Sequence, residues 1–163
     1  FGGSPMCKAF SPWQRINRAK SAHPEKFDAE KESGRKHLEF VRRLYEIQDQ
    51  AGRLFLHEHP LEASSWDEEC IQKIMALPGI EYVDMDQCQY GLLTPSDADR
   101  SKLVPALKPT KWLTNSQVMS EQLSKRCDGS HQHQHLTGGR CKDAAFYPLP
   151  LVRSILKLSL IHI

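Results

Sequence analysis

Helical and strand patterns that alternate along the chain predict an α/β fold. Apolar residues at three- and four-residue spacing in residues 25–50 indicate one amphipathic helix, which Gly52 ends. Short apolar runs at residues 54–56 and 80–88 indicate strands on either side of a second helix that begins near Ser65. This order of loop, helix, strand, helix and strand is typical of a parallel, doubly wound sheet.

Each of these elements has its own local signals. The first helix is expected to bury Leu38, Val41 and either Leu44 or Tyr45 on one face. In the second helix, Ser65 and Glu68 have the spacing of a capping box, and the residue pair 78–79, Pro-Gly, ends the helix.

Two further elements are expected in the last third of the chain. Residues 110–115 have the pattern of a strand. Residues 116–126 have the pattern of a helix whose Val118, Met119 and Leu123 point inward.

Composition limits the class of protein. The chain has 163 residues, which suits one domain, and a formal net charge of +2, which is too small to indicate a nucleic-acid partner by itself. Five cysteines are an odd number, and no signal sequence or long apolar run is present. We therefore expect an intracellular protein, nuclear or cytoplasmic, with no membrane partner; the oligomeric state stays open.

In the loop at residues 3–11, Gly-Ser-Pro-Met-Cys-Lys-Ala-Phe-Ser, a glycine and a proline precede Cys7. Proline fixes the backbone angle φ, and glycine lets the backbone approach a ligand closely. A cysteine held in this way is a candidate nucleophile, although a glycine- and proline-rich loop with an incidental cysteine has the same composition.

This loop resembles the catalytic loop of the cytosine-C5 DNA methyltransferases, in which Met6 stands for a second proline and Lys8 for a glutamine. The resemblance implies that the Cys7 thiolate adds to C6 of a flipped cytosine, since C5 is a poor nucleophile before that addition. The matching residues of this substrate loop are Gly3, Ser4, Pro5, Cys7, Phe10 and Ser11.

Glu58 stands near the end of the expected strand in residues 53–60. In the methyltransferases the strand after the cysteine loop ends in Glu-Asn-Val, and that glutamate holds and protonates N3 of the cytosine. Glu58 matches it, whereas His59 and Pro60 replace Asn-Val. A solvated strand end is the alternative interpretation. If Glu58 is instead catalytic, Cys7 and Glu58 are both expected to lie beyond the carboxyl ends of strands.

The rest of the pattern is less similar to these enzymes. Tyr90-Gly91 resembles the dipeptide after their next strand, but neither Arg100 nor Lys108 stands in register with their base-contacting arginine, so we assign no role to either. Four basic residues follow Cys7 in the sequence. They are expected either to contact the backbone of a DNA duplex or to form a solvated face with no nucleic-acid partner. They are Lys8, Arg15, Arg18 and Lys20.

Residues 2–156 also resemble a methyltransferase-like segment of retroelement polyproteins from algae and dinoflagellates. The similar motifs are His-Glu-His-Pro at residues 57–60, Asp-Gln-Cys-x-Tyr-Gly at 86–91 and Arg-Cys-Asp-Gly-Ser-His at 126–131. The resemblance implies a partial Rossmann-like domain in residues 1–157, the C-terminal half of the catalytic domain. The part that binds S-adenosylmethionine would precede residue 1, DNA would be the partner of the intact parent, and residues 158–163 resemble a non-native read-through tail.

Cysteine and histidine also cluster late in the chain. Cys127 and His131 have finger-like spacing, and alternate histidines in a strand share one face, so His133 and His135 are further candidate zinc ligands. Cys141 or the distant Cys88 are other sources of a ligand, and a polar loop without metal is the alternative. Three functions therefore stay open: a methyltransferase, a catalytically inactive methyltransferase-like module, and a zinc-stabilised nucleic-acid or protein interaction domain.

Overall fold

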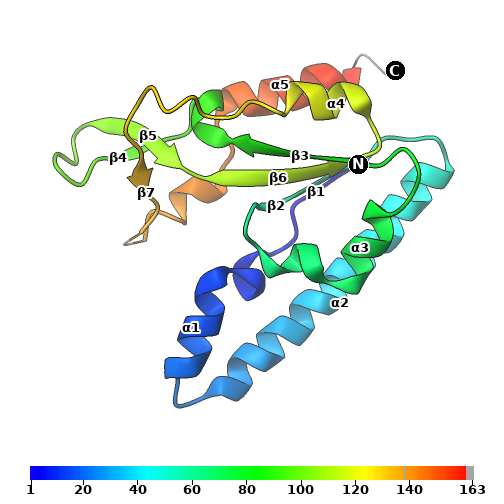
Figure 1. Cartoon of the computed structure of the whole chain (residues 1–163), viewed down its shortest axis with the longest axis horizontal. Coiled ribbons are helices and arrows are strands. Elements are labelled where there is room, and N and C mark those ends of the chain that lie inside the picture. The colour runs from blue at the N-terminus through cyan, green and yellow to red at the C-terminus, as the bar shows by residue number, and fades with distance from the viewer. Residues whose placement is uncertain (138, 161–163) are drawn as a thin grey trace.

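The computed structural model describes residues 1–137 and 139–160, and these form a mixed α/β fold with two sheets and five α-helices (Figure 1). The larger sheet has four strands in the order β1-β2-β6-β3. Their bounds are Gly2–Gly3 for β1, Leu56–Pro60 for β2, Pro109–Thr114 for β6 and Glu81–Asp86 for β3.

Three strands of this sheet run in the same direction. β1 is parallel to β2, and β6 is antiparallel to both β2 and β3, so β1, β2 and β3 share one direction. The α/β class expected from the sequence is confirmed. The antiparallel β6, inserted between β2 and β3, departs from the parallel sheet that the sequence pattern predicted.

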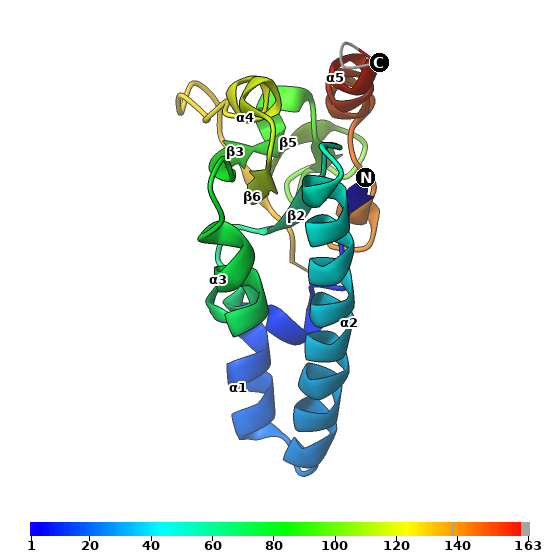
Figure 2. The same cartoon turned by 90° about the vertical axis from the view of Figure 1, so that its right-hand side faces the viewer.

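Helices cover both faces of the larger sheet (Figures 1 and 2). α2 (Pro24–Gln50) and α3 (Glu69–Met75) lie on one face, and α4 (Gln117–Gln122) and α5 (Leu149–Leu160) lie on the other. α1 (Pro12–Lys20) buries no side chain and runs beside the part of α2 that projects beyond the sheet.

Alternation along the strands divides the core into two clusters, because successive side chains of a strand point to opposite faces. On β6, for example, Leu113 packs with α2 and α3, whereas Trp112 packs with α4 and α5. The first cluster contains Phe10, Leu38, Val41, Tyr45, Phe55, Ala63, Trp66, Ile71, Ile74 and Leu113. The second contains Leu56, Met85, Tyr90, Trp112, Met119, Leu123, Leu151 and Leu158.

Several sequence expectations are confirmed. α2 covers the predicted helix and buries Tyr45 rather than Leu44, and Gly52, with φ of +64°, lies just beyond its end. β3 and β6 lie within two residues of the predicted strands at both ends. Of the three residues expected to point inward near α4, Met119 and Leu123 are buried, whereas Val118 is exposed.

Two local predictions are wrong. The expected capping box does not form: the Ser65 hydroxyl bonds His59 instead, residues Ser64–Asp67 form a 3₁₀ helix (η2), and α3 begins only at Glu69. β2 begins at Leu56, three residues after the start of the strand expected in residues 53–60. Glu58 is therefore the central residue of the strand and not its end.

A smaller sheet, β4-β5-β7, extends from the end of the larger one (Figure 1). Its strands are Leu93–Pro95, Leu103–Leu107 and Gln134–His135. Three short 3₁₀ helices complete the described structure, namely η1 (Lys8–Phe10), η3 (Gln87–Tyr90) and η4 (Asp143–Ala145).

The C-terminal residues form part of a helix. Leu158, which the sequence placed in a non-native tail, is a buried residue of α5 and packs in the second cluster. Residues 161–163 of that tail lie outside the described residues. No helix among the described residues has the length and apolar character that a membrane span requires.

Candidate functional site

The cysteine loop is anchored on both sides of Cys7. Before it, the buried carbonyl of Pro5 accepts a hydrogen bond of 2.9 Å from His59 Nε2. After it, the Phe10 ring is buried in the first cluster, and the Ser11 hydroxyl caps α1 by accepting from the backbone N–H of Trp13. Pro5, Phe10 and Ser11 thus hold the loop in place.

Gly3 is required by a close approach. A Cβ atom on this residue would lie 2.2 Å from the Tyr45 hydroxyl oxygen, far inside van der Waals contact. The same hydroxyl lies 2.7 Å from His57 Nδ1, so Tyr45 cannot move aside without losing that hydrogen bond. Glycine at this position lets β1 lie directly over α2.

Glu58 projects from β2 toward the face that α4 and α5 cover. Its carboxylate is buried, and its Oε2 accepts hydrogen bonds of 2.7 Å from Ser4 Oγ and 2.9 Å from Tyr147 Oη. Its Oε1 is also buried but has no hydrogen-bond partner among the described residues. A buried, unsatisfied oxygen is unusual in proteins and leaves this carboxylate able to engage a ligand donor.

Cys7 lies at the exposed start of η1, in the electrostatic field of Glu58. Desolvation and the negative charge of Glu58 raise the pKa of the Cys7 thiol, and the Lys108 ammonium acts in the opposite direction. The fold thus brings the predicted nucleophile and the predicted acid into one neighbourhood. The resting form of Cys7 is the thiol, and a nearby cation favours its thiolate.

Lys108 and Tyr147 complete this polar site, although the sequence assigned no role to either. Lys108 Nζ donates to the Ala144 carbonyl at 2.8 Å and lies 5.5 Å from the centroid of the Tyr147 ring. Burial lowers the pKa of Lys108, which Glu58 partly offsets. Burial and Glu58 raise the pKa of Tyr147, so its hydroxyl remains a donor. Tyr147 stands 89 residues from Glu58 in sequence, and no local motif signals their contact.

A cavity of about 260 Å³ adjoins the two donors to Glu58. Its lining is mainly apolar and includes Gly3, Ser4, Trp112, Tyr147 and Ile155. It opens along β1, between the edge of the sheet and α5, and so offers space for a flat, weakly polar group beside the hydrogen-bonded carboxylate.

Two of the four basic residues that follow Cys7, Lys8 and Arg18, form ion pairs with α2. Lys8 pairs with Glu30 at 2.9 Å and Arg18 with Asp28 at 2.7 Å, and all four side chains are exposed. Exposed pairs of this kind contribute little to stability, and the cations of Lys8 and Arg18 remain accessible at the surface.

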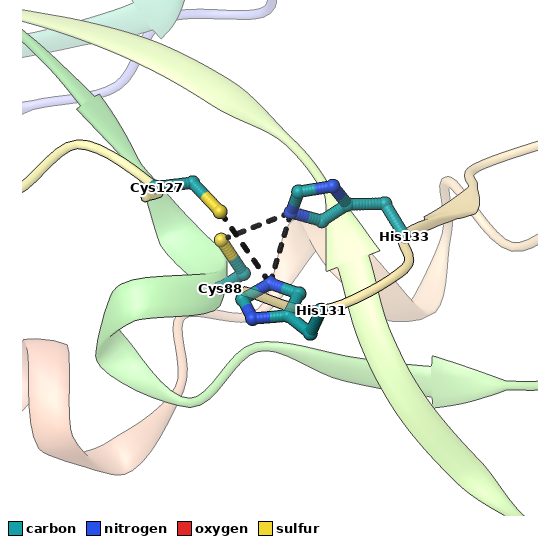
Figure 3. Close-up of side chains that lie close together, drawn as sticks. All are labelled: Cys88, Cys127, His131 and His133. Carbon is teal, nitrogen blue, oxygen red and sulfur yellow. Dashed lines mark hydrogen bonds between the residues drawn. The ribbon is translucent and has the colours of Figure 1, made fainter. Parts of the chain in front are cut away.

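A second group of side chains, the Cys/His cluster, is formed by Cys88, Cys127, His131 and His133 (Figure 3). Their four ligand atoms lie within 4.8 Å of one another, which is close enough to hold a metal ion. Cys88 comes from η3 and the other three from the loop between α4 and β7. Burial, with a contribution from Cys127, raises the pKa of Cys88 to about 11.

The predicted ligand set needs one correction. Cys127, His131 and His133 meet as expected, but His135 is exposed in β7 and Cys88 takes its place. The other candidate, Cys141, is exposed and its thiol contacts the Leu136 carbonyl. Comparisons of the chain with protein-family models, with curated proteins and with solved structures give no match, so inference about function depends on these two sites.

Proposed function

We propose that this chain is the C-terminal half of the catalytic domain of a cytosine-C5 DNA methyltransferase-like protein. The observation that carries the proposal is the buried carboxylate of Glu58. Ser4, a residue of the cysteine loop, donates to one of its oxygens, while the other oxygen has no partner among the described residues. The methyltransferase-like loop and the methyltransferase-like glutamate are therefore in direct contact.

The chemistry assigns a role to each group. The Cys7 thiolate forms a bond to C6 of a flipped cytosine, and the electron pair of the C5–C6 double bond shifts toward C5. Glu58 holds the proton at N3 through Oε1, which draws electrons from the ring and makes the addition feasible. The Lys108 cation favours the thiolate. Bound by the part of the parent that would precede β1, S-adenosylmethionine would supply the methyl group for C5 and leave as S-adenosylhomocysteine. Loss of the C5 proton would then restore the C5–C6 double bond as the C6–S bond breaks, which releases Cys7 as a thiolate.

The arrangement of the larger sheet supports the finer part of the fold prediction, a partial doubly wound sheet. β1, β2 and β3 run in one direction, helices connect β1 to β2 and β2 to β3, and helices cover both faces. In doubly wound sheets ligands bind beyond the carboxyl ends of the parallel strands, and the cysteine loop leaves β1 at that end. We propose that the cofactor site lies on strands that would precede β1 in the intact parent.

A specific observation favours a second candidate, a catalytically inactive methyltransferase-like module of a retroelement polyprotein. The two loop positions that depart from the enzymes, Met6 and Lys8, are both exposed beside Cys7, and the pKa of the Cys7 thiol is raised. A module of this kind would retain the fold and a DNA-binding surface without adding to the base.

A covalent trap separates these two functions. DNA containing 5-fluorocytosine is incubated with S-adenosylmethionine and the full-length protein that carries residues 1–163, and the adduct is measured on a denaturing gel. If the protein is an active methyltransferase, the wild type should form the covalent DNA adduct and Cys7→Ala should form none. Cys141→Ala is the matched control, since it removes another exposed thiol. Glu58→Gln should slow capture by about 10²–10⁴-fold.

Capture that persists in Cys7→Ala would overturn the assignment of the nucleophile. A wild-type protein that binds the DNA but forms no adduct would favour the inactive module. Methyl transfer to unmodified DNA, measured with radiolabelled cofactor, should show the same dependence on Cys7 and Glu58.

A further inference from the structure

The Cys/His cluster has the internal distances of a tetrahedral metal site. His131 Nε2 lies 3.1 Å from His133 Nε2 and 3.6 Å from Cys127 Sγ, and His133 Nε2 lies 3.3 Å from Cys88 Sγ (Figure 3). Zinc bonds of about 2.0–2.1 Å to nitrogen and about 2.3 Å to sulfur place tetrahedral ligands about 3.3–3.8 Å apart. Two of these three separations lie within that range, and the His131–His133 separation is shorter by about 0.2 Å, so a small displacement of one imidazole ring places the four atoms around one small ion.

Neighbouring groups orient the Cys127 ligand. The Asp86 carboxylate accepts 2.8 Å and 2.9 Å hydrogen bonds from the Cys127 backbone N–H and from Arg126 Nε, and it ties this end of the loop to β3. The Gly129 N–H points at the Cys127 sulfur, 3.4 Å away, and Gly129 can take part in this turn because its φ is +75°. A backbone donor directed at sulfur stabilises the thiolate form that a metal requires.

The module around the cluster has a small apolar core, and polar contacts such as the Arg140–Asp97 ion pair supplement it. Among the described residues, the buried part of its apolar core is Leu92, Ala106 and Ala144, with Leu136 packed against them. β7 is two residues long and begins directly after His133. Modules with so small a core are usually stabilised by a metal or by disulfides, and all five cysteines of this chain are free thiols.

We propose that Cys88, Cys127, His131 and His133 bind one structural zinc ion that joins η3 to the loop before β7. Two thiolates and two imidazoles in a tetrahedral arrangement select zinc among common metals. Four protein ligands leave no open position for substrate, so the ion stabilises the fold and does not catalyse. The inference is independent of the methyltransferase proposal, because the four ligands are different residues from those that form the Glu58 site.

The first test is the metal content of the protein purified without added metal, measured by inductively coupled plasma mass spectrometry. We expect one zinc ion per chain. Replacement of that ion by Co²⁺ should give the intense visible absorption of a tetrahedral site together with thiolate-to-metal charge-transfer bands. A chain with no zinc that also gives no such cobalt spectrum would overturn the proposal, as would a Cys88–Cys127 disulfide in the native protein.

Variants then identify the ligands. Cys88→Ser and Cys127→Ser should each lose the bound zinc and the charge-transfer bands, whereas Cys127→His, which keeps a ligand, should retain metal with weaker sulfur bands. His135→Ala and Cys141→Ser are the matched controls and should bind zinc like the wild type. Loss of zinc in either control, with retention in Cys88→Ser, would replace this ligand set by another one.

Hydrogen exchange separates loss of the metal from global unfolding. Removal of zinc by a chelator should speed amide exchange in residues 124–137 and leave β2 and β6 protected. If amide exchange in residues 124–137 is equally fast with and without zinc, the ion does not hold this segment and its structural role is refuted.

Discussion

Acid should destabilise this protein through two buried histidines. His57 and His59 both project from β2 into the face that α2 and α3 cover, where neither side chain is exposed. Burial, together with the neighbouring His59, lowers the pKa of His57 well below its usual value of 6.5. Burial also lowers the pKa of His59, although its hydrogen bond to the Pro5 carbonyl opposes the shift.

The sign and size of the effect follow from these directions. Both histidines stay neutral in the folded protein but take up protons in the unfolded chain below a pH of about 6.5. Their contribution to stability is therefore complete above that pH and is lost as the pH falls toward the folded-state pKa values. Between about pH 7.5 and about pH 5.5 the loss is about 1.4 kcal/mol for His57 and up to the same amount for His59.

Urea unfolding of the wild type and of two variants at both pH values measures this loss. His57→Asn can keep a hydrogen bond with Tyr45 at the position of Nδ1, and His59→Gln can keep the one to Pro5 at the position of Nε2. Each variant should be less stable than the wild type at the higher pH and should lose less stability on acidification. His135→Gln, at an exposed position, is the control and should behave like the wild type.

The wild type and the His57 and His59 variants have all their other side chains in common, so the contribution of those side chains cancels in the comparison. A double variant, His57→Asn with His59→Gln, that loses as much stability on acidification as the wild type would refute the reasoning.

Three further predictions concern the loop and the cofactor. Gly3→Ala should destabilise the protein and displace Tyr45, whereas Gly2→Ala, which meets no atom within 4 Å, should be tolerated; thermal melts and the tyrosine NMR signals compare the two. Phe10→Ala should lower the free energy of unfolding by about 3–5 kcal/mol, because the ring is buried, whereas Trp13→Ala, 64% exposed, should change it little in the same urea experiment. Residues 1–163 alone should bind S-adenosylmethionine weakly or not at all; a stoichiometric, micromolar site in isothermal titration would contradict the assignment of the cofactor to a preceding part of the parent.

Local patterns in the sequence were sufficient for the long helix and the middle strands. α2 has an apolar face, and a glycine follows its end, so its length and its buried residues Leu38 and Val41 could be predicted. β3 was predicted from the alternation of apolar and polar residues in 80–88, and β6 from the strand-like run in 110–115. The candidate nucleophile and acid, Cys7 and Glu58, were also found from sequence, because each stands in a short motif.

Contacts between distant segments were decided only by the tertiary structure. The direction of β6 depends on pairing with two strands at once, and no pattern within its six residues encodes it. The burial of Glu58 and its hydrogen bond from Tyr147 likewise depend on a helix and a loop that are far away in sequence.

The Cys/His cluster was predicted from local sequence only in part, for a physical reason. Equal spacing predicted that His131, His133 and His135 share a face, which holds only for residues within one strand. β7 begins at Gln134, so His131 and His133 belong to a loop and turn toward Cys127, while His135 follows the pleat of the strand toward solvent. Cys88 joins them because the fold brings η3 to that loop, and a contact made by packing across the molecule leaves no trace in local spacing.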